Sequence, residues 1–399
     1  FEVYDFTPIQ YPADDKDANW KTTHFDFHAI HDNVLKLDLL GHVDPMALKM
    51  MEQMTGVDPR TIPMNDPKVL SLFSNPSALG RKRNYLKIDS GALAIPEFGT
   101  ENARNMLRST QPKTFADLLI ISGLSHGTDV WRGNAEELIL NGTCSLREVT
   151  GCRDDIMPYL SGKGLPPNIA FAIMEDVRKG KKVKPEFEKI MKANNVPQYY
   201  IDSCNKIKYM FPKAHATAYV MMAIRVGWYK VYRPLEFYAT FFSVRSKQYD
   251  IEVMIRGENA IIEKLDEFRD RRSHKLKISD KEEEIEKTLT IALEMHERGY
   301  KFTNIDLYRS QASTFIVDST ANAIIPPFTS IDGLGENAAN SVIEARKEGK
   351  FLSKENLLKR TKLNGTNVEV LGQLNVLRDL EETDQMSLFS FNFGEDDIK

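Results

Sequence analysis

The sequence predicts a mostly helical α+β protein divided into several domains. A chain of 399 residues is longer than one ordinary domain, so two to four compact units are expected. Apolar residues recur with helical periodicity from 45 to about 73 and again from 113 to 245, whereas residues 1–45 have the pattern of short strands and turns. Residues 325–380 have the pattern of a compact helical module. Hydrophobic residues make up 42% of the chain, enough for a core in each unit.

Composition excludes some classes of protein. No apolar run reaches the roughly 18 residues of a membrane-spanning helix, so no membrane segment is expected. Three cysteines without a Cys-x-x-Cys pair favour buried thiols in a reducing cytosol. The chain starts at Phe1, with neither an initiator methionine nor a signal peptide, so we expect that the sequence enters a domain part-way.

Charge alone does not identify the partner. The net charge is −4, whereas a protein that coats DNA electrostatically is usually basic. Two basic stretches, 179–184 and 269–277, are balanced by acidic stretches near 282–286 and at the C-terminal end. Such basic stretches form either solvated faces or phosphate-binding tracks, and both interpretations stay open.

Helix boundaries follow from caps and prolines. Capping boxes are expected to begin helices at Thr114 and Ser145. One long helix is expected over 214–231, because an Arg-Pro pair follows it. Residues 250–298 are expected to form two helices separated by the second basic stretch, and residues 304–317 have more strand-like character.

A carboxylate on a strand is expected within residues 35–41. The alternate leucines there point to one side of a strand, so Lys36 and Asp38 point to the other, accessible side. Nucleotidyl transfer needs such a carboxylate, because two Mg²⁺ ions about 4 Å apart are held against the attacking and leaving oxygens. A neighbouring lysine neutralises phosphate charge. The alternative is an amphipathic edge strand with two solvated side chains.

Possible metal ligands are dense just before this stretch. They are His24, Asp26, His28, His31 and Asp32. Their spacing matches no standard zinc pattern closely. We therefore expect these side chains to support a site through hydrogen bonds. A zinc-dependent hydrolase that uses the three histidines is the alternative.

Several stretches are characteristic in combination. They are His24–Asn33, Leu35–His42, Ile121-Ser-Gly-Leu-Ser-His-Gly-Thr-Asp-Val-Trp131, Gly151-Cys-Arg-Asp-Asp-Ile-Met157, Tyr209-Met-Phe-Pro-Lys-Ala-His-Ala216, Asn304–Gln311 and Gln385–Phe389. In this order, and over almost the whole chain, they resemble the PolC-type DNA polymerase III alpha subunits of bacteria.

The resemblance implies a C-family replicative DNA polymerase. Its palm is similar to the nucleotidyltransferase fold and extends a primer with deoxynucleoside triphosphates (dNTPs) on template DNA. Of the three palm aspartates that bind Mg²⁺ in this family, the last corresponds to Asp38, and Lys36 stands beside it. The other two aspartates lie further upstream in such proteins, as do the exonuclease, the histidinol-phosphatase-like domain and the thumb. The resemblance therefore implies a C-terminal fragment that is inactive when isolated.

The fingers of such a polymerase hold a triphosphate, which requires positioning and charge neutralisation. By resemblance, Arg153, Tyr209 and His215 are candidate nucleotide-binding residues. Arg153 can grip phosphate oxygens in a fork, Lys213 adds a donor, and Tyr209 is a platform for the base or sugar. A helix start near Ala214 would aim amides at an anion. A surface ion pair for the arginine and a cap or core contact for the histidine are the structural alternatives.

The stretch 331–335, followed by a helix over 337–346, resembles a helix-hairpin-helix. Gly333 and Gly335 let backbone amides approach a phosphate, assisted by the start of the next helix. This arrangement binds duplex DNA without high net charge. A Gly-x-Gly sequence also serves ordinary helix turns, which is the alternative.

Gln385, Leu388 and Phe389 stand out in a polar, acidic tail. A flexible Gln-x-x-Leu-Phe peptide can bury two apolar anchors in a pocket of a partner. The family resemblance names that partner as the beta sliding clamp, one of several replisome subunits. The alternative is a tail that packs on its own body.

The expected domain order combines these assignments. The domains are 1–105, the C-terminal part of the palm and the start of the fingers; 106–248, the fingers; 249–320, a duplex-binding region; 321–382, the helix-hairpin-helix module; and 383–399, a flexible clamp-binding tail. Such a protein acts in the bacterial cytoplasm at the nucleoid, with primer-template DNA and dNTPs as its partners and no membrane. A DNA- and clamp-binding module without catalysis of its own is the second interpretation.

Overall fold

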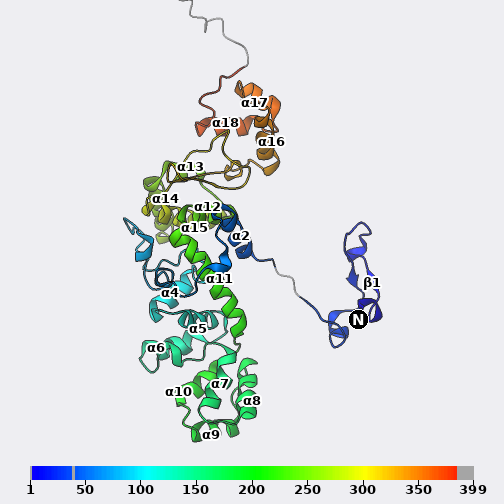
Figure 1. The fold of residues 1–399 in the computed structure, drawn as a ribbon, viewed down its shortest axis with the longest axis vertical. Coiled ribbons are helices and arrows are strands. Elements are labelled where there is room, and N and C mark those ends of the chain that lie inside the picture. The colour runs from blue at the N-terminus through cyan, green and yellow to red at the C-terminus, as the bar shows by residue number, and fades with distance from the viewer. Residues whose placement is uncertain (1, 38–40, 384–399) are drawn as a thin grey trace, which may run out of the picture. The chain divides into compact units, whose positions relative to one another are not determined.

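The computed structural model describes residues 2–37 and 41–383, and the chain divides into two compact units. Unit 1 is Phe1–Val43 and unit 2 is Asp44–Lys399. The elements are mostly helices with a few short strands (Figure 1), which confirms the predicted α+β, mostly helical fold class. Within the described ranges, no helix is both long and apolar enough to cross a membrane.

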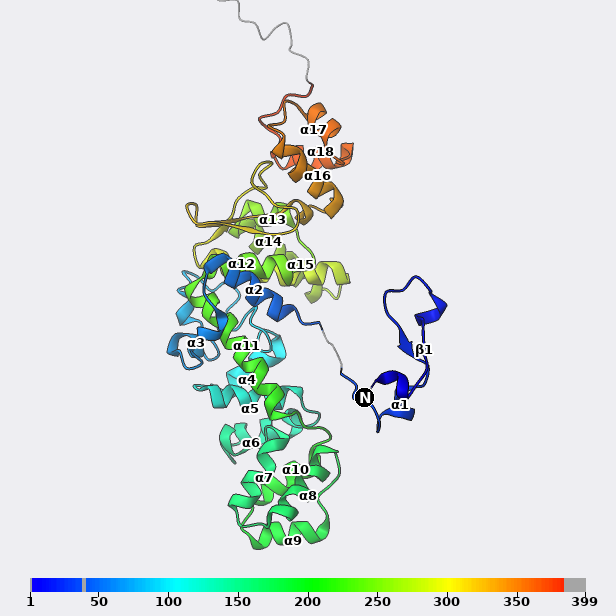
Figure 2. The same ribbon diagram turned by 45° about the vertical axis from the view of Figure 1, so that its right-hand side comes forward.

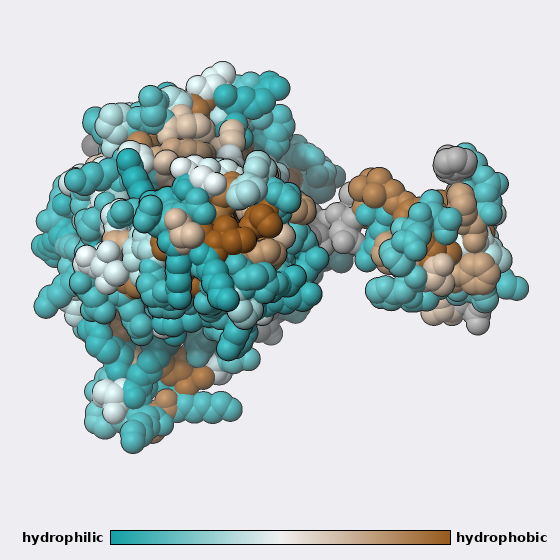
Figure 3. Space-filling view, turned by 90° about the horizontal axis from the view of Figure 1, so that it is seen from below, coloured by the Kyte–Doolittle hydropathy of each residue, from teal (hydrophilic) through white to brown (hydrophobic). Residues whose placement is uncertain are grey.

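Unit 1 consists of short elements. Strands β1 (Ile9–Gln10) and β2 (Thr22–Thr23) pair antiparallel, and helix α1 (Phe27–Ile30) follows. The carboxylate of Asp26 caps this helix by accepting a hydrogen bond from the amide of His28. Hydrophobic surface is visible on the unit among hydrophilic residues (Figure 3), as expected where so few residues share a core.

The strand expected over 35–41 does not form in the described part of that stretch. Residues 35–37 belong to no helix or strand, and Leu35 and Leu37 are 84% and 73% exposed. A strand needs a neighbour that pairs with its amides and carbonyls. Within residues 2–37 and 41–43 the only sheet has strands of two residues. The expectation was therefore wrong for residues 35–37, and Asp38 lies outside the described residues.

Helices dominate unit 2. In chain order they are α2 (Val43–Thr55), α3 (Pro67–Ser71), α4 (Glu101–Thr110), α5 (Phe115–His126), α6 (Glu136–Leu140), α7 (Arg153–Gly162), α8 (Pro167–Arg178), α9 (Pro185–Ala193), α10 (Gln198–Lys206), α11 (Lys213–Tyr232), α12 (Pro234–Val244), α13 (Ile251–Arg256), α14 (Glu258–Ser273), α15 (Asp280–Glu297), α16 (Glu336–Lys347), α17 (Lys354–Arg360) and α18 (Gly365–Gln373). The capping boxes predicted at Thr114 and Ser145 both form. The predicted long helix is α11.

Helix α11 runs through the part of unit 2 that α3 to α10 form (Figures 1 and 2). It packs on α3, α5 and α7 and continues into α12. Gly227 permits the close approach, since a Cβ there would lie 3.3 Å from a Val69 methyl and 3.4 Å from a Leu72 methyl. One hydrophobic core surrounds this contact, and a second extends from α2 to α18.

A small sheet lies between α15 and α16 in the chain. Strand β5 (Ala323–Ile325) pairs parallel with β3 (Lys301–Phe302) and antiparallel with β4 (Ile316–Asp318). The strand-like character expected over 304–317 is therefore wrong for most of that range. The carboxylate of Asp306 accepts hydrogen bonds from the amides of residues 308 and 309, and its own amide donates to Ser310. These local bonds favour a turn over a strand ladder.

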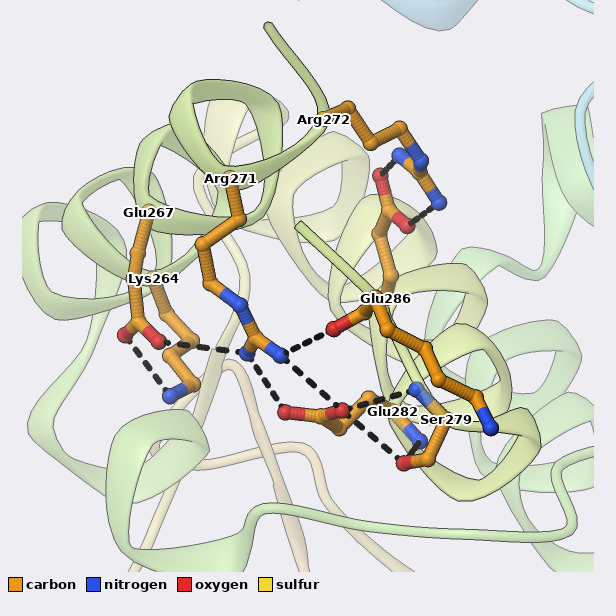
Figure 4. A network of polar contacts seen from close by, with 8 residues as sticks. Lys264, Glu267, Arg271, Arg272, Ser279, Glu282 and Glu286 are labelled. Carbon is orange, nitrogen blue, oxygen red and sulfur yellow. Dashed lines mark hydrogen bonds and ion pairs between the residues drawn. The ribbon is translucent and has the colours of Figure 1, made fainter. Parts of the chain in front are cut away.

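The two helices expected over 250–298 are α14 and α15, and the short helix α13 precedes them. The second basic stretch begins at the end of α14, and Figure 4 shows its residues Arg271 and Arg272 beside Glu282 and Glu286 of α15. The guanidinium of Arg271 lies 2.5 Å from the Glu282 carboxylate, and both terminal nitrogens of Arg272 bind the Glu286 carboxylate. Because these charges are neutralised between two helices, the stretch is better described as a paired, solvated face than as a phosphate track.

A buried ion pair connects α11 with α15. Lys230 Nζ lies 2.8 Å from Glu294 Oε1, and their side chains are 0% and 1% exposed. The ammonium also donates to the carbonyls of Gly91 and Leu93, and the hydroxyl of Tyr238 donates to the same carboxylate at 2.8 Å. Burial lowers the pKa of Lys230 to about 8, and the neighbouring carboxylate opposes that shift. The pair joins three separate segments of the chain.

His296 is expected to make the protein sensitive to acid. Its Nε2 atom is buried without a hydrogen-bond partner in the described chain, and burial lowers its pKa to about 4. Between pH 6.5 and pH 4 the unfolded chain therefore binds the extra proton, so the free energy of unfolding falls with falling pH, by up to about 3 kcal/mol. Urea denaturation at pH 7 and pH 4 should show this fall. His296→Gln should remove it, whereas His274→Gln, at an exposed site, should leave it.

Candidate functional site

The N-terminal ends of α7 and α11 meet, and they bring Arg153 and Lys213 together. Arg153 is the first residue of α7, and its amide donates to the carbonyl of Phe211 at 3.3 Å. The amide of Lys213, the first residue of α11, donates to the Asp154 carboxylate at 2.7 Å. The predicted helix start near 214 is thus present one residue earlier, but its first amide already has a carboxylate acceptor.

Both candidate cations at these helix ends have carboxylate neighbours. Lys213 Nζ lies 2.5 Å from Asp155 Oδ1, and this hydrogen bond raises the pKa of the lysine. Arg153 Nε lies 3.8 Å from Asp154 Oδ2. A pocket of about 210 Å³ beside Lys213 and Asp155 is smaller than ordinary ligand pockets, which start near roughly 300 Å³. These helix ends form one wall of a site, not an enclosed nucleotide pocket.

Tyr209 and His215 lie on either side of this helix start. Tyr209 is 46% exposed, and its backbone pairs with that of Thr128 in the loop after α5. His215 is exposed, and its Nε2 lies 3.1 Å from the hydroxyl of Tyr219 one turn further along α11. The structure therefore brings the segment 209–215 to the start of α7 through the backbone contact between Arg153 and Phe211, and the Phe211 ring stacks on His126 of α5.

Two acidic residues that the sequence did not single out form ion pairs beside this segment. Asp129 Oδ2 lies 2.7 Å from the ammonium of Lys208, and Glu97 Oε2 lies 2.7 Å from Nε2 of His126. Both acids have a positive φ, 57° for Asp129 and 67° for Glu97. No sequence signal marks Glu97, whereas Asp129 belongs to a residue type that is enriched in that backbone conformation.

The candidates of unit 1 lie in a different setting. Lys36 has its ammonium 5.2 Å from the ring centroid of Phe27. His24 Nδ1 is 2.7 Å from Gln10 Oε1, and His31 contacts the His28 carbonyl and Asp32. No three His, Cys, Asp or Glu side chains gather into a metal-binding group in residues 2–37 and 41–383. The described residues therefore offer no ligand set for the zinc site of the alternative interpretation. Asp38, the predicted Mg²⁺ ligand, lies outside the described residues.

The predicted hairpin precedes α16. Gly333 has a φ of +79°, and nothing lies within 4 Å of a Cβ added there or at Gly335. Among the hydrogen bonds of the described residues, none has the amide of Gly333, Gly335 or Glu336 as its donor. A groove of about 350 Å³ runs between this hairpin and residues 247–249. The amides thus point out of the protein's own hydrogen-bond network, as an anion site at a helix start requires.

The hairpin itself carries no positive charge, since residues 331–335 include no basic residue. Its Asp332 instead lies 2.8 Å from the ammonium of Lys281 in the first turn of α15. Lys247 lines the groove opposite. The cations next to the hairpin therefore come from other elements. Gln385, Leu388 and Phe389 of the predicted clamp-binding tail lie outside the described residues.

Two family models match parts of this chain. Residues 42–195 match the family "Bacterial DNA polymerase III alpha subunit finger domain", and residues 299–386 match "Helix-hairpin-helix motif". The chain thus has the finger domain of bacterial DNA polymerase III alpha subunits, which defines its class.

Within that class the relatives are DNA polymerase III of the PolC type. The chain is 54% identical over 97% of its length to the proteins of Bacillus cereus and Bacillus subtilis, and 50% identical to that of Staphylococcus aureus. The chain belongs to this PolC-type sequence family, which confirms the resemblance. It spans about 27% of the length of these relatives.

Proposed function

We propose that the chain is part of a DNA-directed DNA polymerase that extends a primer with dNTPs by two-metal nucleotidyl transfer. The observation that carries this proposal is identity above 50% with PolC-type polymerases over nearly the whole chain, including the finger domain. In this proposal residues 1–105 complete the palm and begin the fingers, 106–248 form the fingers, 249–320 contact duplex DNA, and 321–382 form the helix-hairpin-helix module.

In the proposed nucleotide site, the ends of α7 and α11 contact the triphosphate of the incoming dNTP. Arg153 and Lys213 would exchange their partners Asp154 and Asp155 for phosphate oxygens. His215 adds a donor from the first turn of α11. Tyr209, already exposed, supports the base or sugar. The paired carboxylates hold the cations in place before the nucleotide arrives, which reduces the entropy lost on binding.

Asp38 is the proposed ligand for catalytic Mg²⁺ from this chain, and Lys36 neutralises phosphate charge beside it. In this proposal, two further palm aspartates share the metal ions with Asp38, because a pair of Mg²⁺ ions needs several oxygen ligands. Primer extension by the full-length protein, compared with extension by residues 1–399 alone, tests the assignment. Mg²⁺-dependent extension by the full-length protein supports it, and no extension by that protein would refute it.

The hairpin is proposed to bind a phosphate of duplex DNA through the amides near Gly333 and Gly335. Gly333→Ala is expected to weaken duplex binding several-fold, because a side chain disfavours the left-handed backbone that presents these amides. Fluorescence anisotropy with labelled duplex measures the affinity. Gly349→Ala is the matched control, since Gly349 also has a positive φ, with open space around it, beyond the end of α16. Equal losses in both variants would indicate general destabilisation and contradict the proposal.

The tail residues Gln385, Leu388 and Phe389 are proposed to bind the beta sliding clamp, alongside contacts with other replisome subunits at the bacterial nucleoid. A short peptide of this kind gives modest affinity, and attachment to a ring around DNA increases its effective concentration. The motif begins at the end of the helix-hairpin-helix match, which runs to residue 386, and continues beyond it.

A DNA- and clamp-binding module without catalysis of its own is the second candidate for the isolated chain. The match of residues 299–386 to a helix-hairpin-helix, in a chain that spans about 27% of its relatives, favours it. The two candidates differ in one measurement. Residues 1–399 alone should bind duplex DNA in both cases, but they should extend a primer only if the chain contains a complete active site.

A further inference from the structure

The segment 208–215 is held by two acids whose backbones are in a rarely occupied conformation. Asp129 and Glu97 have φ values of 57° and 67°. Residues other than glycine occupy this region uncommonly, and they stay there only where the surrounding structure fixes them. The Asp129 carboxylate forms an ion pair with Lys208 of the segment itself. The Glu97 carboxylate instead pairs with His126, whose ring stacks on Phe211 of the segment.

Glu97 cannot easily move, because the residues on both sides are anchored in the core. Ile95 and Phe98 are 2% and 1% exposed, and the Phe98 ring packs edge-on against Phe73 at 5.0 Å. The loop closes through a hydrogen bond from the amide of Gly99 to the carbonyl of Ile95 at 2.9 Å. A Cβ at Gly99 would lie only 2.9 Å from that carbonyl oxygen, so this turn requires glycine. The carboxylate is therefore presented to His126 from a rigid turn.

Both ring nitrogens of His126 face acceptors. Nδ1 lies 2.8 Å from the carbonyl oxygen of Ser122 and 2.9 Å from the hydroxyl of Ser125, which itself donates to that carbonyl, and Nε2 lies 2.7 Å from the Glu97 carboxylate. A neutral imidazole has one N–H, whereas the imidazolium has two and satisfies both contacts. The hydrogen bond that Nε2–H of His126 donates to the Glu97 carboxylate raises the pKa of His126, and burial opposes that shift. The two acceptor contacts and the neighbouring negative charge of Glu97 therefore both favour the protonated form of His126.

The protonated ring lies against the candidate nucleotide-binding segment. Its centroid is 4.6 Å from that of Phe211 with the planes 24° apart, and it is parallel within 4° to Tyr219 at 6.2 Å. A cation over an aromatic face is attracted to it. The carbonyl of Phe211 accepts a hydrogen bond from the amide of Arg153, and the hydroxyl of Tyr219 lies within hydrogen-bond distance of Nε2 of His215. The charge on His126 is therefore coupled to two proposed nucleotide contacts.

We propose that Glu97 is a positioning residue, which keeps His126 as an imidazolium so that its stack on Phe211 and Tyr219 fixes the segment 208–215. The inference rests on the proposed function, since that segment is the proposed triphosphate contact. The titratable and polar groups that contact His126 are Glu97 from the loop before α4, Ser122 and Ser125 from α5, and Tyr219 from α11. Glu97 is the carboxylate among them.

The test in the full-length protein compares dNTP KM and kcat for primer extension across pH 6 to 9. The unmodified protein should show a KM that rises as pH rises and His126 loses its proton. Glu97→Gln should move that rise to lower pH and increase KM at neutral pH by about ten-fold, with kcat little changed, because binding geometry is lost while the reacting groups remain. Glu97→Asp should restore part of the profile. Glu101→Gln, an exposed neighbour at the start of α4, should behave as the unmodified protein.

A structural measurement separates this inference from the proposed function. NMR titration of histidine ring protons in residues 1–399 should show His126 losing its proton above the usual pH, and losing it at lower pH in Glu97→Gln. His126→Gln identifies the resonance and should raise KM at every pH, without altering the strained loop. An unchanged titration, or a shifted titration with unchanged KM, would overturn the positioning role. Absence of extension by the unmodified protein would instead overturn the proposed function, and this inference with it.

Discussion

Asp38→Asn in the full-length protein should reduce primer extension by roughly a thousand-fold or more and leave duplex binding unchanged. An amide is a poor ligand for Mg²⁺ compared with a carboxylate, so the metals that stabilise the charge developing in phosphoryl transfer would be displaced. The proposed duplex contact is the hairpin before α16, which the substitution does not touch. Steady-state extension and duplex affinity, measured on the same preparation, check both halves of this expectation.

The control for this substitution is Asp17→Asn. Asp17 lies in the same unit and is exposed. Its substitution should leave extension within about two-fold of the unmodified protein, as is usual for a surface change away from a site. Parallel loss of extension and DNA binding in Asp38→Asn would remove Asp38 from the proposed catalytic role.

Glu294→Gln should lower the free energy of unfolding by about 3–5 kcal/mol, because it leaves the fully buried Lys230 ammonium without its counter-charge. The hydroxyl of Tyr238 also loses a charged acceptor. Urea denaturation, monitored by tryptophan fluorescence, measures the change. The double variant Lys230→Met with Glu294→Leu should recover much of the loss, because no buried charge remains.

Glu344→Gln is the matched control for the buried pair. Glu344 and Lys347 form an ion pair at 2.7 Å on α16, but both side chains are more than 60% exposed. Exposed pairs contribute about 0–1 kcal/mol, so this change should be small. If Glu294→Gln were as mild as Glu344→Gln, the buried pair would not hold α11 and α15 together.

Local sequence signals predicted the helices of unit 2 well. Capping boxes at Thr114 and Ser145 and the proline after α11 act within a few residues, so the sequence contains the whole cause. The strand expected at residues 35–37 was wrong because a strand depends on a distant neighbour, which alternation of leucines cannot supply. The turn after Asn304 was missed because the Asp306 carboxylate competes with strand pairing.

The candidate site was predictable only in part. Family motifs pointed to Arg153 and His215, and the structure places both near the start of α11. The carboxylates that support them, Glu97 and Asp129, come from other segments and act through folded geometry. The left-handed backbone of Glu97 carries no marker in the sequence, because it results from the buried residues on either side of it, whereas aspartate at 129 is a weak marker of that conformation.

Helix α11 has a mechanical consequence. Its 20 residues span about 30 Å without a break, from Lys213 at one end to the buried Lys230 near the other. A continuous helix of this length is stiff, so a change of tilt at its buried end would be transmitted to its other end. A rotation of about 5° at Lys230 would displace Lys213 by roughly 2 Å, which is enough to break a hydrogen bond.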